Sequence, residues 1–245
     1  MVKMFDDVPT LPMGFEQEYQ IQMTADAMRQ HGLDDYKAEL DEVTIDSYMQ
    51  ILDNRSARDN IGVRVMKVSD SNAWMVTHTI PDDALEKVFG PHKLVLPVYN
   101  NRHFSLVVMN IMNGTATHYE PANSNRHEQF VRREVIPKLE AIANIPLAYV
   151  RGQAPKQVPQ SNECGIFVCG YADFISRCDE EVLNNLSQNQ MKKFRPLIAY
   201  DLSCGNHGLP ITRNPVIPPR DSKGKRRRSS SLSRGSPQKR SFYRG

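Results

Sequence analysis

Two strongly apolar stretches and a third strand signal, joined by short polar turns, lie between residues 93 and 120 and constrain the fold more than any other part of the chain. Residues 93–99 are almost continuously apolar, and a second such run covers residues 103–110 after a polar turn of three residues. The Asn113-Gly114 turn signal separates this run from a third expected strand, residues 115–120, which is more polar. Long apolar runs of this kind are typical of strands covered on both faces. We therefore expect a central sheet with helices packed against it.

Helical patterns flank this central stretch on both sides. In residues 40–52, apolar side chains recur at the spacing of one helix face and acidic residues occupy the first turn. The other segments expected to be helical are residues 15–29, 81–89, 127–143, 164–177 and 187–202, and further strands are expected at residues 61–69, around 74–76 and at 147–150. Together these elements predict an α+β fold, with a small mixed central sheet flanked by helices.

The composition predicts one folded domain with an extension at each end. The chain has 245 residues, of which 40% are hydrophobic, enough for one well-buried core with residues left over. We expect an N-terminal extension over residues 1–36 and the folded domain over residues 37–204. In residues 205–245, five prolines and a run of basic and serine residues leave too little apolar surface to offset the entropy of ordering, so this tail is expected to be disordered.

The charge is distributed unevenly along the chain. From residue 220 onwards there are ten Lys and Arg against one Asp, although the whole chain carries a net charge of only +3. A basic tail of this kind favours nuclear import or a weak contact with nucleic acid. The four cysteines show no paired metal-ligand spacing, and no apolar run approaches membrane-spanning length. We therefore expect a reduced protein of the nucleus or cytoplasm, without a membrane contact, a metal or a cofactor.

Cys164 stands where a polar lead-in meets an apolar run, so it is expected at the beginning of a buried helix. The first backbone N–H groups of a helix have no intrahelical partner, and they stabilise a thiolate placed beside them. Such a cysteine is a candidate nucleophile. The alternative is that Cys164 is one more small buried apolar residue.

Residues that a thiol nucleophile needs occur elsewhere in the chain. His103 begins one expected strand and Glu120 ends the next, so a hairpin brings both to the same end of the sheet. His103 is thus a candidate base and Glu120 a candidate orienting acid, while His118, on the same strand face as Glu120, is a rival base. Gln160, just before the cysteine, is a candidate oxyanion donor together with the Cys164 backbone N–H.

The order His, acid, Gln and Cys resembles the ubiquitin-like-protein-specific cysteine proteases, which are SUMO-protease-type peptidases in the same clan as the adenoviral protease. The segments that carry the resemblance are His103-Phe104-Ser105-Leu106, Tyr119-Glu120-Pro121 and Val158-Pro159-Gln160-Ser161-Asn162-Glu163-Cys164-Gly165. It implies Cys164 as nucleophile, His103 as base, Glu120 as orienting acid and Gln160 as oxyanion donor. The implied reaction is hydrolysis of an amide or isopeptide bond after a glycine, with SUMO or another ubiquitin-like modifier as partner. Gln160 lies two residues closer to the cysteine than the family pattern has it.

Three alternatives remain open at this point. The same His103, Glu120 and Cys164 order resembles the YopJ-type acetyltransferases, which use it on acetyl-CoA. An inactive relative would bind a modifier without turnover, and a viral relative would process a polyprotein. The helix expected at residues 40–52 fits the protease better than the acetyltransferase.

Overall fold

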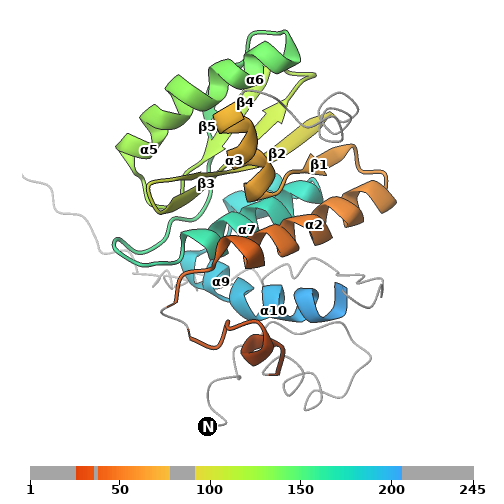
Figure 1. The fold of residues 1–245 in the computed structure, drawn as a ribbon, viewed down its shortest axis with the longest axis vertical. Helices are drawn as coiled ribbons and strands as arrows, with labels where there is room; N and C mark the ends of the chain where they lie inside the picture. The colour runs from red at the N-terminus through yellow and green to blue at the C-terminus, as the bar shows by residue number, and fades with distance from the viewer. Residues whose placement is uncertain (1–25, 36–37, 78–91, 206–245) are drawn as a thin grey trace, which may run out of the picture.

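The central sheet has five strands in the order β1-β2-β3-β4-β5. The computed structural model describes residues 26–35, 38–77 and 92–205 (Figure 1). The strands are β1 (Val63–Val65), β2 (Lys93–Asn100), β3 (His103–Asn110), β4 (Thr115–Tyr119) and β5 (Ala148–Arg151). The three central strands pair antiparallel, whereas β1 and β5 are added parallel at the two edges. The prediction of a mixed central sheet is confirmed.

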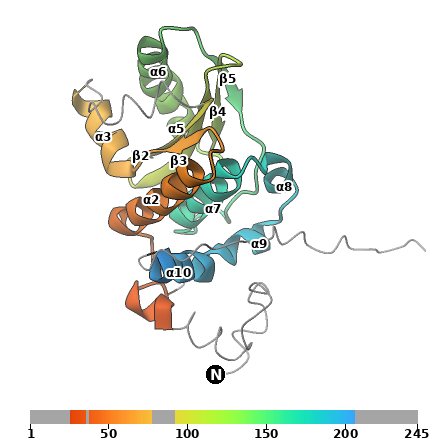
Figure 2. The ribbon, with the colours of Figure 1, turned by 90° about the vertical axis from the view of Figure 1, so that its right-hand side faces the viewer.

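Helices cover both faces of this sheet. In the described residues they are α2 (Glu42–Arg58), α3 (Val68–Thr77), α5 (Asn125–Phe130), α6 (Ile136–Ala143), α7 (Cys164–Ser176), α8 (Glu180–Asn184), α9 (Gln188–Lys192) and α10 (Phe194–Gly205), with a π-helical turn, η2 (Val131–Val135), between α5 and α6. Figures 1 and 2 show α2, α7 and α10 on one side of the sheet and α5 and α6 on the other. None of these helices combines the length and the apolar character needed to span a bilayer.

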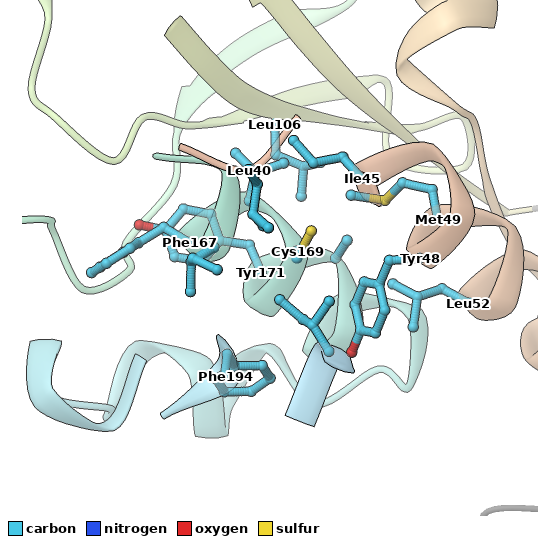
Figure 3. Packing of buried hydrophobic residues seen from close by; sticks show 14 of the residues in the cluster. Leu40, Ile45, Tyr48, Met49, Leu52, Leu106, Phe167, Cys169, Tyr171 and Phe194 are labelled. Atoms are coloured by element: carbon cyan, nitrogen blue, oxygen red, sulfur yellow. The ribbon is translucent and has the colours of Figure 1, made fainter. Parts of the chain in front are cut away.

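The alternation of side chains along the strands builds two separate cores. On β3, Leu106 and Val108 point into the core shared with α2, α7 and α10, while Val107 and Met109 point into the core shared with α3 and α6. Figure 3 shows the first core, where residues of α2 pack against α7 and Phe194. Every residue of α7 is buried. This helix is therefore held rigidly in the molecule, with Cys164 as its first residue.

Of the two strands expected between residues 61 and 77, the first is much shorter than expected and the second is wrong. Only Val63–Val65 forms a strand, and the predicted strand around residues 74–76 lies inside helix α3. The carboxylate of Asp46, on α2, accepts hydrogen bonds from the backbone N–H groups of Val68 and Ser69 at 2.5 Å and 3.3 Å. The Asp46 carboxylate thus provides hydrogen-bond acceptors for the free N–H groups at the beginning of α3. Because Asp46 belongs to a distant part of the sequence, no local pattern indicates this cap.

Prolines explain two further differences in the helices. The helix expected over residues 127–143 is interrupted by the π-helical turn η2, which ends two residues before Pro137. Pro137 has no N–H to donate to the preceding turn. The helix expected over residues 187–202 is divided at Lys193 into α9 and α10, and Pro196 lies in the first turn of α10. The short helix α8 had no counterpart among the expected elements.

Some expectations fall on parts of the chain outside the described residues. Of the helix expected over residues 15–29, only the end falls in the described part, where residues 26–30 are helical. The helix expected over residues 81–89 lies outside it, as does the tail expected over residues 205–245 apart from its first residue. The expected strand at residues 147–150 is confirmed as β5, and the expected helix at residues 164–177 is confirmed as α7.

Gly152, directly after β5, allows the chain to pass against the ring of Tyr119 on its way to Cys164. A Cβ at this position would lie 2.5 Å from Cδ1 of Tyr119. We predict that Gly152→Ala lowers the free energy of unfolding by about 1–3 kcal/mol, as overpacking does in other cores. Urea denaturation will measure it. In a Tyr119→Ala background, which lacks the Cγ, Cδ1 and Cε1 atoms that the new Cβ would meet, most of the cost should disappear. An equal cost in both backgrounds would contradict the clash.

Candidate active site

Cys164 is the first residue of α7 and lies almost entirely below the surface, with 7% of its area exposed. The residue before it, Glu163, makes no side-chain capping hydrogen bond. The next residue, Gly165, lets α7 approach Leu40 closely, since a Cβ there would lie 2.9 Å from Cβ of Leu40. The thiol is thus fixed at a helix beginning whose first N–H groups lack intrahelical partners. The expectation that Cys164 begins a buried helix is confirmed.

A tight hairpin loop places His103 at the edge of the sheet. Asn100 pairs with His103, so the loop between β2 and β3 consists of Asn101 and Arg102 alone. Both have positive φ, 51° and 60°. This conformation at both positions is the one that matches the twist of two hairpin strands. His103 therefore begins β3 directly after a two-residue turn, with its side chain 18% exposed.

The following hairpin brings Glu120 to the same end of the sheet. β3 and β4 are antiparallel with Leu106 opposite Tyr119, so the residue after Tyr119 lies near the beginning of β3. Nε2 of His103 donates a hydrogen bond to Oε1 of Glu120 at 2.8 Å. The backbone N–H of Ala122 donates to the same oxygen at 2.7 Å. The sequence-based expectation that His103 and Glu120 come together agrees with this geometry.

His103 is hydrogen-bonded to Cys164 as well as to Glu120. Since Nε2 faces Glu120, Nδ1 is the nitrogen left for the thiol. Burial by itself would lower the pKa of His103, but the hydrogen bonds to Cys164 and Glu120, together with the charges of both groups, raise it to about 9. The imidazole is thus positively charged at neutral pH. A thiol, a charged imidazole and a carboxylate form one continuous line, an arrangement suited to nucleophilic attack on a carbonyl.

The two glutamines before Cys164 lie in different environments. Gln160 is exposed in a turn, with φ of 64°. Gln157 is buried, and its side-chain amide donates to the carbonyl oxygen of Ser161 at 2.9 Å. Its backbone N–H donates to the carbonyl oxygen of Pro121 at 2.9 Å, which ties the loop before Cys164 to the residue after Glu120. The sequence motif before Cys164 indicated Gln160 as the candidate oxyanion donor. It gave no indication of Gln157, because no local pattern shows that this residue is buried.

Two further histidines lie behind the line formed by Cys164, His103 and Glu120. His118, on β4, is fully buried and shares a hydrogen bond of 3.0 Å between Nδ1 and the hydroxyl of Tyr149. His127, on α5, is hydrogen-bonded through Nε2 to the hydroxyl of Ser105 at 2.8 Å, and its ring meets that of His103 edge-on, with centroids 4.8 Å apart.

Both of these histidines are neutral at pH 7. Burial lowers the pKa of His118 to about 3 and the pKa of His127 to about 4. His118, the rival base considered from the sequence, is hydrogen-bonded to Tyr149. His103 is the histidine that is hydrogen-bonded to Cys164, so the geometry favours His103 as the base. His127 gave no signal in the sequence, because α5 reaches the site only through packing of the helix layer on the sheet.

The structure resembles solved proteases in fold. It superposes on the C-terminal Ulp1 protease domain solved in complex with Smt3, the yeast ortholog of SUMO, with a TM-score of 0.61 and 12% identity, covering 79% of this chain and 97% of that one. The structure of Ulp1 with its catalytic cysteine oxidised to a sulfenic acid gives a TM-score of 0.60 at 11% identity, covering 80% and 99%. The catalytic domain of the Ulp1-like SUMO protease of Chaetomium thermophilum gives 0.54 at 16% identity, covering 68% and 73%.

Sequence comparisons agree with the fold. The chain is 26% identical over 124 residues to sentrin-specific protease 2 of Rattus norvegicus and 25% identical over 124 residues to that of Homo sapiens. These matches cover 47% of this chain but only 21% and 20% of the relatives, so the chain matches about a fifth of their length. The family model for the C-terminal catalytic domain of the Ulp1 proteases matches residues 79–205, about half of the chain. The chain therefore belongs to the Ulp1 protease family of cysteine peptidases.

Proposed function

We propose that this protein is a cysteine protease that hydrolyses the amide or isopeptide bond after the C-terminal glycine of SUMO or another ubiquitin-like modifier. The observation that carries the proposal is the hydrogen-bonded line Cys164, His103 and Glu120 inside a Ulp1-family catalytic domain. The modifier as substrate is supported by the relative solved in complex with Smt3. The family match favours peptide hydrolysis over acetyl transfer.

The proposed reaction proceeds through a thioester. The sulfur of Cys164 attacks the glycine carbonyl carbon, and the C=O electron pair moves onto the oxygen, where the Cys164 backbone N–H donates a hydrogen bond. As the C–N bond breaks, the leaving amine takes the proton of His103. A water molecule then gives a proton to His103 while its oxygen attacks the thioester carbon. The C–S bond breaks, which releases the modifier as a carboxylic acid and leaves the sulfur as a thiolate beside the protonated imidazole. The carboxylic acid then loses its proton to the solvent. Glu120 holds the imidazole ring in place and stabilises its positive charge throughout.

A panel of modifiers that carry a C-terminal electrophile tests the proposed activity. SUMO-type and other ubiquitin-like modifiers are incubated separately with the protein, and covalent adducts are mapped by mass spectrometry. We expect at least one modifier to attach at Cys164. Binding of a modifier without adduct formation or turnover would support an inactive relative instead. Radiolabelled acetyl left on the protein after incubation with acetyl-CoA would support the acetyltransferase.

The rate of hydrolysis should depend on pH in the same way as the fraction of His103 that is protonated. Because the hydrogen bonds and charges of Cys164 and Glu120 raise the pKa of His103 to about 9, the imidazolium persists well above its ordinary pKa. We predict that kcat/KM stays level between neutral pH and about pH 8 and falls through about pH 9, as the proton needed by the leaving amine is lost. Rates measured against pH with a fluorogenic modifier substrate, in the presence of a chelator, check this. An alkaline limb centred near the ordinary histidine pKa would contradict it.

The two glutamines give a paired prediction about the oxyanion. Gln157 is buried beside the loop that enters α7, and one of its two amide N–H groups is engaged by Ser161. Burial therefore favours Gln157 as the side-chain donor, with Gln160 still a candidate. We predict that Gln157→Ala lowers kcat by about 100-fold, as loss of one oxyanion donor does elsewhere. Gln160→Ala is the matched control and should leave kcat nearly unchanged; the reverse order of effects would assign the role to Gln160.

The basic segment from residue 220 onwards supports a proposal about location. We expect it to direct the protein to the nucleus, with nucleic-acid contact as a weaker second role. Replacing the run Lys225-Arg226-Arg227-Arg228 with glutamines should shift a fluorescent fusion towards the cytoplasm. A distribution that does not change would remove the import role.

A further inference from the structure

Three buried side chains behind the catalytic line converge on one point. His118 comes from β4, Glu120 follows that strand, and His127 comes from α5 on the helix layer above. One ligand atom from each lies within 4.8 Å of the other two, and all three residues are buried. Two imidazoles and a carboxylate are a donor set that zinc commonly takes in proteins.

Two of the converging atoms have no hydrogen-bond partner among the described residues. They are Nε2 of His118 and Oε2 of Glu120, and both are shielded from solvent. A buried acceptor left without a donor costs about 1–3 kcal/mol, so native proteins seldom leave two of them side by side. Glu120 already accepts through Oε1, so Oε2 remains to bind a cation. Nε2 of His118 carries a lone pair in the tautomer whose Nδ1–H donates to the Tyr149 hydroxyl.

The rings of both histidines are held by hydroxyl groups on their other side. Nδ1 of His118 is hydrogen-bonded to Tyr149, and Nε2 of His127 is hydrogen-bonded to Ser105. Outer partners of this kind fix the ring plane of a metal-binding histidine and the nitrogen that it presents. Ligand atoms around a tetrahedral zinc, with bonds of about 2.0–2.2 Å, lie roughly 3.4 Å apart, so small side-chain movements would close the observed arrangement.

We propose that His118, Glu120 and His127 bind a zinc ion or a similar divalent transition metal. The spacing of cysteines in the sequence gave no sign of such a site, because its ligands come from a strand, the residue after it and a helix that packs across the sheet. The site shares Glu120 with the proposed catalytic line, yet metal binding does not depend on protease activity.

The test measures metal binding directly in the Cys164→Ala protein, because the thiol and imidazole of a catalytic pair bind zinc by themselves. After treatment with a chelator, the protein is titrated with Zn²⁺ and, in parallel, with Co²⁺. We expect one equivalent to bind, and the near-ultraviolet spectrum of the Co²⁺ form should lack a thiolate charge-transfer band. That band, if present, would place the metal on one of the other cysteines and overturn the proposal.

Matched variants in the same background identify the ligands. His118→Gln and His127→Gln should each weaken Zn²⁺ binding by at least about 100-fold, the upper end of what loss of an outer partner costs. His31→Gln removes a histidine outside the cluster and should leave affinity unchanged. Binding that survives both ligand substitutions, or no saturable binding to the parent protein, would overturn the site.

Ser105→Ala keeps the test decisive if the buried ligand variants do not fold. It removes only the hydroxyl that holds His127, and we expect binding weakened by about 10–100-fold. In addition, Zn²⁺ should raise the melting temperature of the Cys164→Ala protein, because a ligand bound only by the folded state stabilises it. Unchanged affinity in Ser105→Ala together with no thermal shift would count against the proposal.

Discussion

Substitution of Cys164 by alanine should reduce hydrolysis of a modifier precursor by at least about 10⁴-fold, the range seen when a covalent nucleophile is removed from other hydrolases. The reason lies in the geometry, since the thiol begins a fully buried helix and is hydrogen-bonded to the charged imidazole of His103. Single-turnover rates, followed by release of the C-terminal extension, give the measurement.

The control for this prediction is another cysteine of the same protein. Cys178 is free and exposed, just after the end of α7. Cys178→Ala should keep activity within about twofold, as surface substitutions usually do. Equal labelling of Cys164→Ala and wild type by a modifier with a C-terminal electrophile would show that the nucleophile lies elsewhere.

Substitution of Glu120 by glutamine should lower kcat by about 10³–10⁴-fold, as loss of the acid does in other triads. Glutamine is close to the same size but carries no charge, so it no longer favours the imidazolium of His103. The alkaline limb of the pH profile should therefore move below the value of about 9 that the intact pair sets. Both quantities come from one series of rates against pH, recorded with a chelator present.

The Glu120→Asp variant separates the effect of the carboxylate charge from the effect of the side-chain length. It keeps the carboxylate but shortens the side chain by one methylene, so the hydrogen bond of 2.8 Å to His103 would be stretched or lost. We expect activity between that of wild type and that of Glu120→Gln, with an alkaline limb that stays above that of the glutamine variant. A glutamine variant with nearly full activity and an unmoved limb would mean that another group orients the imidazole.

The sequence was sufficient for β2, β3 and α7 because their signals are local. β2 and β3 are apolar along nearly their whole length, and α7 follows a polar lead-in with thirteen buried residues. Helix α3 was misjudged because its first N–H groups are capped by Asp46 from another helix. The helix over residues 187–202 was taken as continuous, although Pro196 favours a new beginning.

The candidate site could be predicted to the extent that it follows from hairpins. A turn between His103 and Glu120 in an antiparallel pair brings them together by register alone, which a sequence pattern indicates. Gln157 and His127 depend instead on how a loop and a helix pack over the sheet. No periodicity contains that information, so the sequence pointed to Gln160 and gave no indication of His127.

The loop that carries Gln157 differs in kind from the elements that carry the other groups. Cys164 lies on a buried helix, and His103 and Glu120 lie at the ends of paired strands. The loop is attached by hydrogen bonds from Gln157 to Pro121 and Ser161, and by Lys156 Nζ, which donates to the carbonyl oxygen of Glu120 at 2.6 Å. We therefore expect substitutions between residues 156 and 163 to change the rate of turnover more than they change the melting temperature, which depends mainly on the two cores.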